Sequence, residues 1–152
     1  MTSHPALTQL LRLLDEAFDR KSWHGTNLRG SLRRVTPALA AWRPAPGRHT
    51  IHELVVHAAY WKYAVRRRLT GEKRGSFARG GSNWFARGAA SASVWREDVA
   101  LLVEEHAALR HAAARLRAAD LAGPLGHLVR GAAAHDLYHA GQIQLLKRLF
   151  PH

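Results

Sequence analysis

Apolar residues recur every three or four positions along most of the chain, and this spacing predicts amphipathic helices. Shorter helical turns are expected at residues 27–34 and between Pro37 and Pro44. No segment shows the strict alternation typical of a β-strand, and the chain has no internal repeat. The pattern therefore predicts an all-α fold, a four-helix bundle in which one connection is long. The four long helices are expected at residues 5–19, 51–69, 93–118 and 125–150.

The long connection lies between the second and third of these helices. Thr50 and Glu53 fit a capping box that starts the second helix, and Gly71 ends it. Residues 71–92 are rich in Gly, Ser and Arg, with three aromatic residues set among them, Phe77, Trp84 and Phe85. Connections longer than about 15 residues without helix or strand are uncommon and often functional. We therefore expect this segment to be a candidate lid over a site.

The length and charge of the chain limit its class. Its 152 residues are most simply one domain, residues 1–152. The chain has 23 Lys and Arg against 11 Asp and Glu, which gives a net charge of +12. Such a charge raises the possibility of a nucleic-acid partner. However, the arginines are spread along the whole chain and no recognised nucleic-acid motif accompanies them, so we do not expect nucleic acid to be the main partner.

Several chemistries and locations are also excluded. The chain has no cysteine, so disulfides, thiolate metal ligands and cysteine nucleophiles are absent and any metal needs His, Asp or Glu. No apolar run approaches the roughly 18 residues that a membrane span requires. The N-terminal residues do not resemble a signal or transit peptide. We expect a cytoplasmic protein without a membrane partner.

Two histidines of the last helix form the first candidate site. His135 and His139 are four residues apart, so they lie one turn apart on the same helix face. That face also carries Leu128 and Ala132, which places the pair on the stripe expected to face the core. Buried polar groups need partners. A metal ion would supply one for both rings.

The second long helix offers one further ligand. His52 and His57 stand in the string H-E-L-V-V-H, which has one residue more than the zincin motif H-E-x-x-H. Five residues place the two side chains about 140° apart, so they cannot bind the same ion. His57 shares a face with Leu54 and Trp61, and we choose it. The predicted metal ligands are His57, His135 and His139.

Three neutral imidazoles with an open position are typical of a zinc site, so Zn²⁺ is favoured, with Ni²⁺ or another divalent ion as alternatives. A ferritin-type di-iron centre is excluded because the chain has no Glu-x-x-His. His57 on its own has an alternative interpretation as a packed core histidine. His106 lies on the apolar stripe of the third long helix and could replace His57 or add a fourth ligand, although we expect it to be packed. His24 and His49 could line the mouth of the site.

Several motifs together resemble the DinB/YfiT-like family of small bacterial helical bundles. They are Trp23-His24-Gly25, the run from His49 to His57 with Trp61-Lys62, and the ending H-x-x-x-H-x-G-Q-I from His135 to Ile143. The similarity covers nearly the whole chain in the same order. It implies a four-helix bundle that holds a divalent metal with three histidines, which map onto His57, His135 and His139, and it implies frequent homodimers.

The family resemblance also implies candidate activities. Some relatives are S-transferases or isomerases that use low-molecular-weight thiols such as bacillithiol or mycothiol, and others are assigned as hydrolases. We therefore expect a metal-dependent thiol S-transferase in which the metal presents a thiolate to an electrophilic small molecule. The alternatives are a hydrolase with a metal-activated water and a metal-stabilised binding module without enzymatic activity.

The sequence suggests supporting residues for this chemistry. Arg74, Arg79 or Arg87 of the long connection could hold carboxylates of a thiol, or they could be solvated loop charges. Trp84 could form a wall of the pocket, and Gln142 could orient a ligand. Hydrolysis needs a general base. Glu53 is the only acid near the proposed face, and its capping role already explains it, whereas Asp136 points about 100° away from His135.

Overall fold

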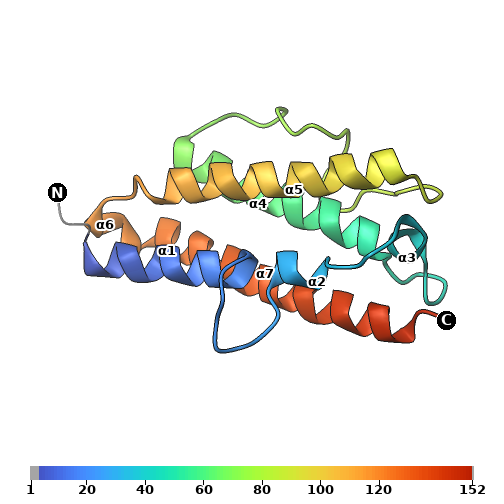
Figure 1. Cartoon of the computed structure of the whole chain (residues 1–152). Coiled ribbons are helices and arrows are strands. Elements are labelled where there is room, and N and C mark those ends of the chain that lie inside the picture. The colour runs from blue at the N-terminus through green and yellow to red at the C-terminus, as the bar shows by residue number, and fades with distance from the viewer. Residues whose placement is uncertain (1–3, 152) are drawn as a thin grey trace.

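The computed structural model describes residues 4–151, and all regular structure in this range is helical. The predicted all-α class is confirmed. Within this range, no helix has both the length and the apolar character that crossing a bilayer requires. The helices are α1 (Pro5–Phe18), α2 (Leu28–Ser31), α3 (Pro37–Ala41), α4 (Ile51–Thr70), α5 (Ala92–Ala113), α6 (Ala118–Leu121) and α7 (Pro124–Leu149) (Figure 1).

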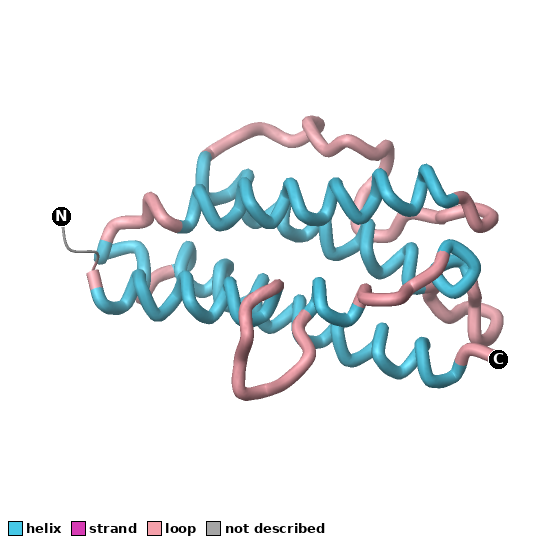
Figure 2. The backbone as a smooth tube through the Cα atoms, viewed as in Figure 1, coloured by secondary structure: helices cyan, strands magenta, loops and turns pink. Residues whose placement is uncertain are grey.

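The four longest helices form two pairs that run in opposite directions. Figure 1 shows α1 and α7 running one way and α4 and α5 running the other. The connection between α4 and α5, residues 71–91, passes back along the outside of this pair (Figure 2). α4 packs against both α5 and α7. The histidines of α4 can therefore meet those of α7 in the interior.

Local sequence signals explain where α4 begins and ends. The Thr50 hydroxyl accepts a hydrogen bond from the Glu53 amide at 3.1 Å, and the Glu53 carboxylate accepts one from the Thr50 amide at 3.0 Å. This reciprocal pair is the expected capping box. Gly71 ends the helix with φ 76°, a left-handed conformation that favours glycine.

The apolar stripes form two core clusters. One, around Phe18, Leu54 and Leu102, joins α4 and α5 to the second half of α7. The other, around Leu14 and Val129, joins α1 to the first half of α7 and to α6. Both clusters fix α7 against its neighbours along its whole length, so the histidines of α7 sit on a well-packed helix.

The third predicted helix, residues 93–118, is too long at its C-terminal end. The structure ends α5 at Ala113 and starts the separate turn α6 at Ala118. The Asp120 carboxylate accepts a hydrogen bond from the Arg117 amide, and the turn buries Leu121 against the second core cluster. The intervening residues are Ala, Arg and Leu, which are strong helix formers, so the sequence carried no stop signal.

Candidate metal centre

The structure brings together the three histidines that the sequence singled out. His57 comes from α4, and His135 and His139 come from α7. Nε2 of His135 lies 3.1 Å from Nε2 of His57 and 2.9 Å from Nε2 of His139. One ring nitrogen from each histidine lies within 4.8 Å of the others, a spacing that could hold one metal ion.

The outer nitrogens of two rings fix which nitrogen carries the proton. Nδ1 of His57 lies 2.7 Å from the carbonyl oxygen of Asn83, and Nδ1 of His139 lies 2.6 Å from Oε1 of Gln142. Both partners are acceptors, so each Nδ1 donates, and in the neutral ring Nε2 then presents a lone pair. Two lone pairs therefore face His135. Its Nε2 has one proton at most, so the cluster lacks hydrogen-bond donors in its centre.

Burial keeps these rings neutral. It lowers the pKa of His135 to about 3, with the neighbouring His139 and His57 adding to the effect, and it lowers the pKa of His139 to about 4. Burial also lowers the pKa of His57. Metal ligation requires unprotonated imidazole nitrogen. The donor set therefore fits a divalent ion such as Zn²⁺ without any proton having to be displaced from a charged ring.

The long connection covers one side of the cluster. The ring of Trp84 stacks on His57, with centroids 3.8 Å apart, and His49 stacks on the other face of Trp84 at 3.5 Å. The indole N–H of Trp61 donates to Oδ1 of Asn83 at 2.9 Å. Trp84 thus packs between His57 and His49, while His24 hydrogen-bonds Ser22 in a separate loop.

Comparison with known proteins identifies the family of the chain. The family model described as the DinB superfamily matches residues 20–143, most of the chain, including all three histidines. The chain belongs to the DinB superfamily. Searches of curated proteins and of solved structures found no match.

The histidine that could have been a fourth ligand belongs elsewhere in this DinB protein. His106 stacks on Phe18 with centroids 3.7 Å apart, and its Nδ1 lies 3.2 Å from Nζ of Lys62. Nζ of Lys62 donates to Asp136 at 2.5 Å. All three polar side chains are buried. We refer to Lys62, His106 and Asp136 as the sealed cluster; the prediction that His106 is packed is confirmed.

Glu53 and His52, the other candidate residues of α4, already have partners within the protein. Nη2 of Arg43 donates to Glu53 at 2.6 Å. Burial alone would raise the pKa of Glu53, but the hydrogen bonds from Arg43 and the Thr50 amide outweigh it and hold that pKa below its ordinary value. His52 lies 2.7 Å from Asp98 on α5, away from the three histidines. Glu53 is therefore a capping and ion-pairing residue.

Two of the three arginines suggested for ligand binding serve the fold. Nη2 of Arg79 lies 2.7 Å from Oδ1 of Asp98, and Nη2 of Arg87 lies 2.6 Å from Oδ2 of the same carboxylate. Asp98 is buried on α5. Both arginines clamp the long connection onto α5, a role that neither alternative from the sequence included. Among residues 4–151, Arg74 has no such partner.

Asn83 is the residue that sequence reasoning missed. Its carbonyl fixes His57 and its side chain fixes Trp61, although it lies 26 residues from His57 in sequence. It adopts φ 62°, a left-handed conformation that asparagine tolerates better than most residues. The only signal in the sequence is an Asn after Gly80-Gly81-Ser82, which indicates a turn without indicating its contacts.

Proposed function

We propose that this protein is a divalent-metal-dependent enzyme of the thiol S-transferase class, with His57, His135 and His139 as the metal ligands. The observation that carries the proposal is the convergence of three neutral imidazoles, two of which have their lone pairs directed inward by Asn83 and Gln142. Zn²⁺ suits three nitrogen ligands with an open position, and Ni²⁺ is the alternative.

The contacts favour a thiol over water as the reacting group. A bound divalent ion would supply Lewis acidity, which lowers the pKa of a coordinated thiol or water. Hydrolysis also needs a general base within hydrogen-bond reach. The buried carboxylates of residues 4–151 are Glu53, Asp98 and Asp136, and each is already paired with a cation. A thiol starts from a pKa of about 8.5, far below the roughly 15.7 of water, so a metal-bound thiol would lose its proton to solvent near neutral pH without a protein base.

In this chemistry the protein orients the histidine rings and keeps water away from part of the site. Asn83 holds the His57 ring through Nδ1, and Gln142 holds the His139 ring in the same way. Trp84 covers one face of His57. His135 is only partly buried, so the access that remains lies on its side of the cluster.

Metal content tests the site itself. The purified protein is expected to contain one divalent ion per chain, measured by mass spectrometry of the elements. His139→Ala should lose the ion, while His111→Ala, at an exposed histidine of α5, should keep it. A protein that holds no divalent ion, or a His139→Ala variant with unchanged content, would contradict the proposal.

Thiol ligation is tested on protein loaded with Co²⁺. Titration with cysteine should produce a sulfur-to-cobalt charge-transfer band, and serine, which has a hydroxyl in place of the thiol, should not. Loss of the visible cobalt spectrum in His139→Ala serves as the site control. If cysteine and a panel of other low-molecular-weight thiols leave the spectrum unchanged, the hydrolase alternative replaces the transferase. A site without activity toward either class of substrate would be a binding module.

The homodimer that the resemblance implies stays a prediction, as does the cytoplasmic location. The large apolar side chains most exposed on residues 4–151 include Trp23, Tyr138 and Leu145. Light scattering of Trp23→Ser and Leu145→Ser against the unchanged chain would test whether this surface joins two copies.

A further inference from the structure

A basic cleft lies between α4 and the long connection. Its volume is about 470 Å³, and its aromatic walls include Trp61 and Phe77. No acidic side chain is among its lining residues. Four arginines line it: Arg67, Arg68, Arg74 and Arg79. We call it the arginine cleft.

The arginine cleft differs from two other clefts that also carry several arginines. A second cleft of about 770 Å³ carries arginines too, but Glu72 and Asp120 line it with them. A third, of about 480 Å³, combines Arg12 and Arg110 with Asp15 and Glu16. In those clefts the positive charge is balanced by neighbouring carboxylates. In the arginine cleft no carboxylate of residues 4–151 lines the wall, and within that range Arg79 alone of its four arginines makes an ion pair, with Asp98.

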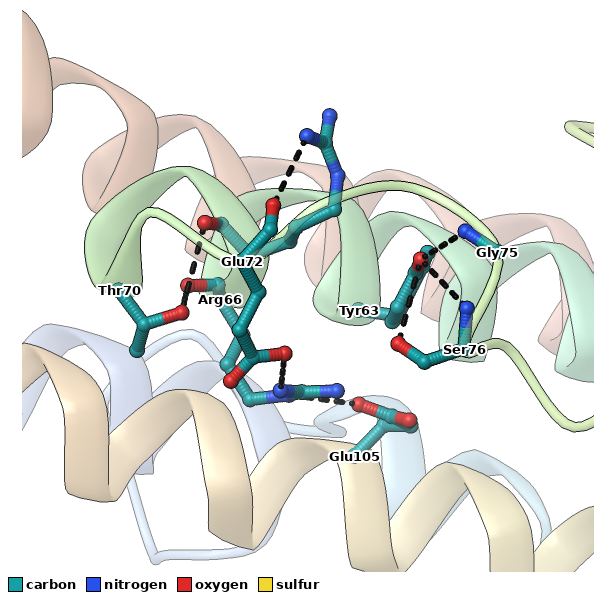
Figure 3. A network of polar contacts seen from close by, with 8 residues as sticks. Tyr63, Arg66, Thr70, Glu72, Gly75, Ser76 and Glu105 are labelled. Atoms are coloured by element: carbon teal, nitrogen blue, oxygen red, sulfur yellow. Dashed lines mark hydrogen bonds and ion pairs between the residues drawn. The ribbon is translucent and has the colours of Figure 1, made fainter.

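The backbone that carries Arg74 is held on both sides. Before it, Arg66 donates to the Glu72 carboxylate at 2.6 Å and Arg67 donates to the Glu72 carbonyl (Figure 3). After it, the Tyr63 hydroxyl accepts hydrogen bonds from the amides of Gly75 and Ser76, at 3.1 Å and 3.3 Å. Figure 3 shows these two anchors on either side of the turn. The position of Arg74 is thus fixed by the fold.

The side chains of Arg68 and Arg74 are themselves unengaged. Both are exposed, and within residues 4–151 neither makes an ion pair. Arg79, in contrast, is bound to Asp98. Guanidinium groups on a fixed backbone, lined up in one cleft and without protein partners, are well suited to bind carboxylate or phosphate oxygens.

A smaller cleft adjoins the arginine cleft and reaches one of the three histidines. This cleft of about 170 Å³ is lined by Trp61, Arg68 and His135, and its remaining walls are mostly apolar: Val65, Leu128 and Ala132 among them. Trp61 and Arg68 line both clefts. The ring of Trp61 lies 6.3 Å from that of His135, centroid to centroid. Arg68 and Trp61 therefore border both the arginine cleft and the smaller, mostly apolar cleft that the partly exposed His135 lines.

We propose that the arginine cleft binds the oxyanion end, carboxylate or phosphate, of a small-molecule ligand through Arg68 and Arg74. The part of the ligand next to it is apolar and passes Trp61 toward His135. This second statement rests on the proposed function, since it assigns the reacting end of the ligand to the metal centre. The anion site itself does not depend on a metal.

The experiment is an NMR titration of the ¹⁵N-labelled full chain with succinate and, separately, with inorganic phosphate, at ionic strength matched with chloride. Saturable shifts are expected at the Trp61 indole N–H. The double variant Arg68→Gln/Arg74→Gln should weaken binding by at least about tenfold, since two charge-assisted contacts are removed. Tighter binding of succinate would indicate a dicarboxylate, and tighter binding of phosphate would indicate a phosphate ester.

A matched control separates this site from general charge effects. Arg96→Gln/Arg115→Gln removes the same charge from two exposed arginines outside the cleft, and binding should stay within about twofold of the unchanged chain. Equal weakening by both double variants, or no saturable shift with either anion, would overturn the proposal. Metal content measured on the same samples should be equal in all of them. A protein that binds the anions but no metal would overturn the proposed function and leave the anion site standing.

Discussion

Two polar clusters lie side by side on α4 and α7, and they differ in whether their polar groups find partners within the protein. The sealed cluster contains a cation, an anion and a histidine that contact one another. The cluster of His57, His135 and His139 contains only neutral rings whose inward nitrogens have too few protons among them. Adjacent residues of α7, His135 and Asp136, belong to different clusters. One arrangement is complete within the protein, whereas the other presents lone pairs that a metal ion could accept.

This difference distinguishes the two clusters more clearly than burial does. His106 is as buried as His57, and burial lowers its pKa to about 3. By burial and pKa alone it would be as good a candidate ligand. Its neighbours decide otherwise, because Lys62 and Phe18 contact the ring and, among residues 4–151, no second imidazole contacts it.

The largest effect is expected from breaking the sealed cluster. Asp136→Ala leaves Lys62 buried without its anion, and loss of one partner of a buried ion pair costs about 3–5 kcal/mol of unfolding free energy. Chemical denaturation would measure it. The double variant Lys62→Met/Asp136→Leu should recover most of the loss, because it removes both charges. Asp15→Ala, in a more exposed pair with Arg110, is the control and should cost less than about 1 kcal/mol. An Asp136→Ala variant as stable as that control would show that the sealed cluster is not structural.

Acid should destabilise the protein through both clusters. The pKa values of His106 and His135 are lowered to about 3 and that of His139 to about 4, while an unfolded imidazole titrates near 6.5. Between these values the unfolded chain binds more protons, so stability is full above pH 6.5 and is lost as pH falls toward 3–4. Burial raises the pKa of Asp136 to about 6, so this carboxylate takes up a proton in the folded state. Its proton offsets the uptake by one histidine in the unfolded chain.

Three histidines less one aspartate give a net uptake of about two protons on unfolding. The unfolding free energy is therefore expected to fall by about 3 kcal/mol for each pH unit between pH 6 and 5. Denaturation curves of the metal-free protein at several pH values would measure the slope. A stability that is flat across this range would mean that the buried histidines are solvated enough to charge in the folded state.

A smaller effect is expected from the residue that orients His139. Gln142→Leu removes the acceptor of the His139 Nδ1 proton, and outer partners of metal-ligating histidines typically contribute about 10- to 100-fold in metal affinity. Competition with a chelator would measure the change. Gln144→Leu is a matched control two residues away, where the side-chain oxygen has no hydrogen-bond partner among the described residues, and it should leave the metal affinity unchanged. Equal effects at both positions would remove Gln142 from the site.

Much of this comparison could be predicted from local patterns. The spacing of His135 and His139 placed both on one face, and the five-residue interval between His52 and His57 separated those two, as the structure shows. The capping box and Gly71 gave the bounds of α4 because cap chemistry involves neighbours in sequence. The family resemblance is confirmed.

What could not be predicted depends on contacts distant in sequence. Lys62 meets Asp136 across 74 residues, and Arg79 and Arg87 meet Asp98 from a connection without periodicity. Nothing in the residue types distinguishes an arginine that binds Asp98 from one, such as Arg74, that points into a cleft. The end of α5 was misplaced for a related reason, since tertiary burial of Leu121 overrides the helix propensity of the residues before it.

The smallest effect is expected from removing His135 in the absence of metal. This ring lies between two acceptors and can donate to only one of them, so the metal-free protein gains about one hydrogen bond from it, worth about 1 kcal/mol. His135→Ala should therefore change the unfolding free energy of the metal-free chain by no more than about 1 kcal/mol, while Asp136→Ala, at the next residue, costs several times more. With metal present the unchanged chain should gain stability and His135→Ala should not, since only the former binds the ion in its folded state. Thermal denaturation with and without Zn²⁺ measures both. A large loss in the metal-free His135→Ala variant would mean that the three histidines hold the fold together as the sealed cluster does, and the distinction between the two clusters would fail.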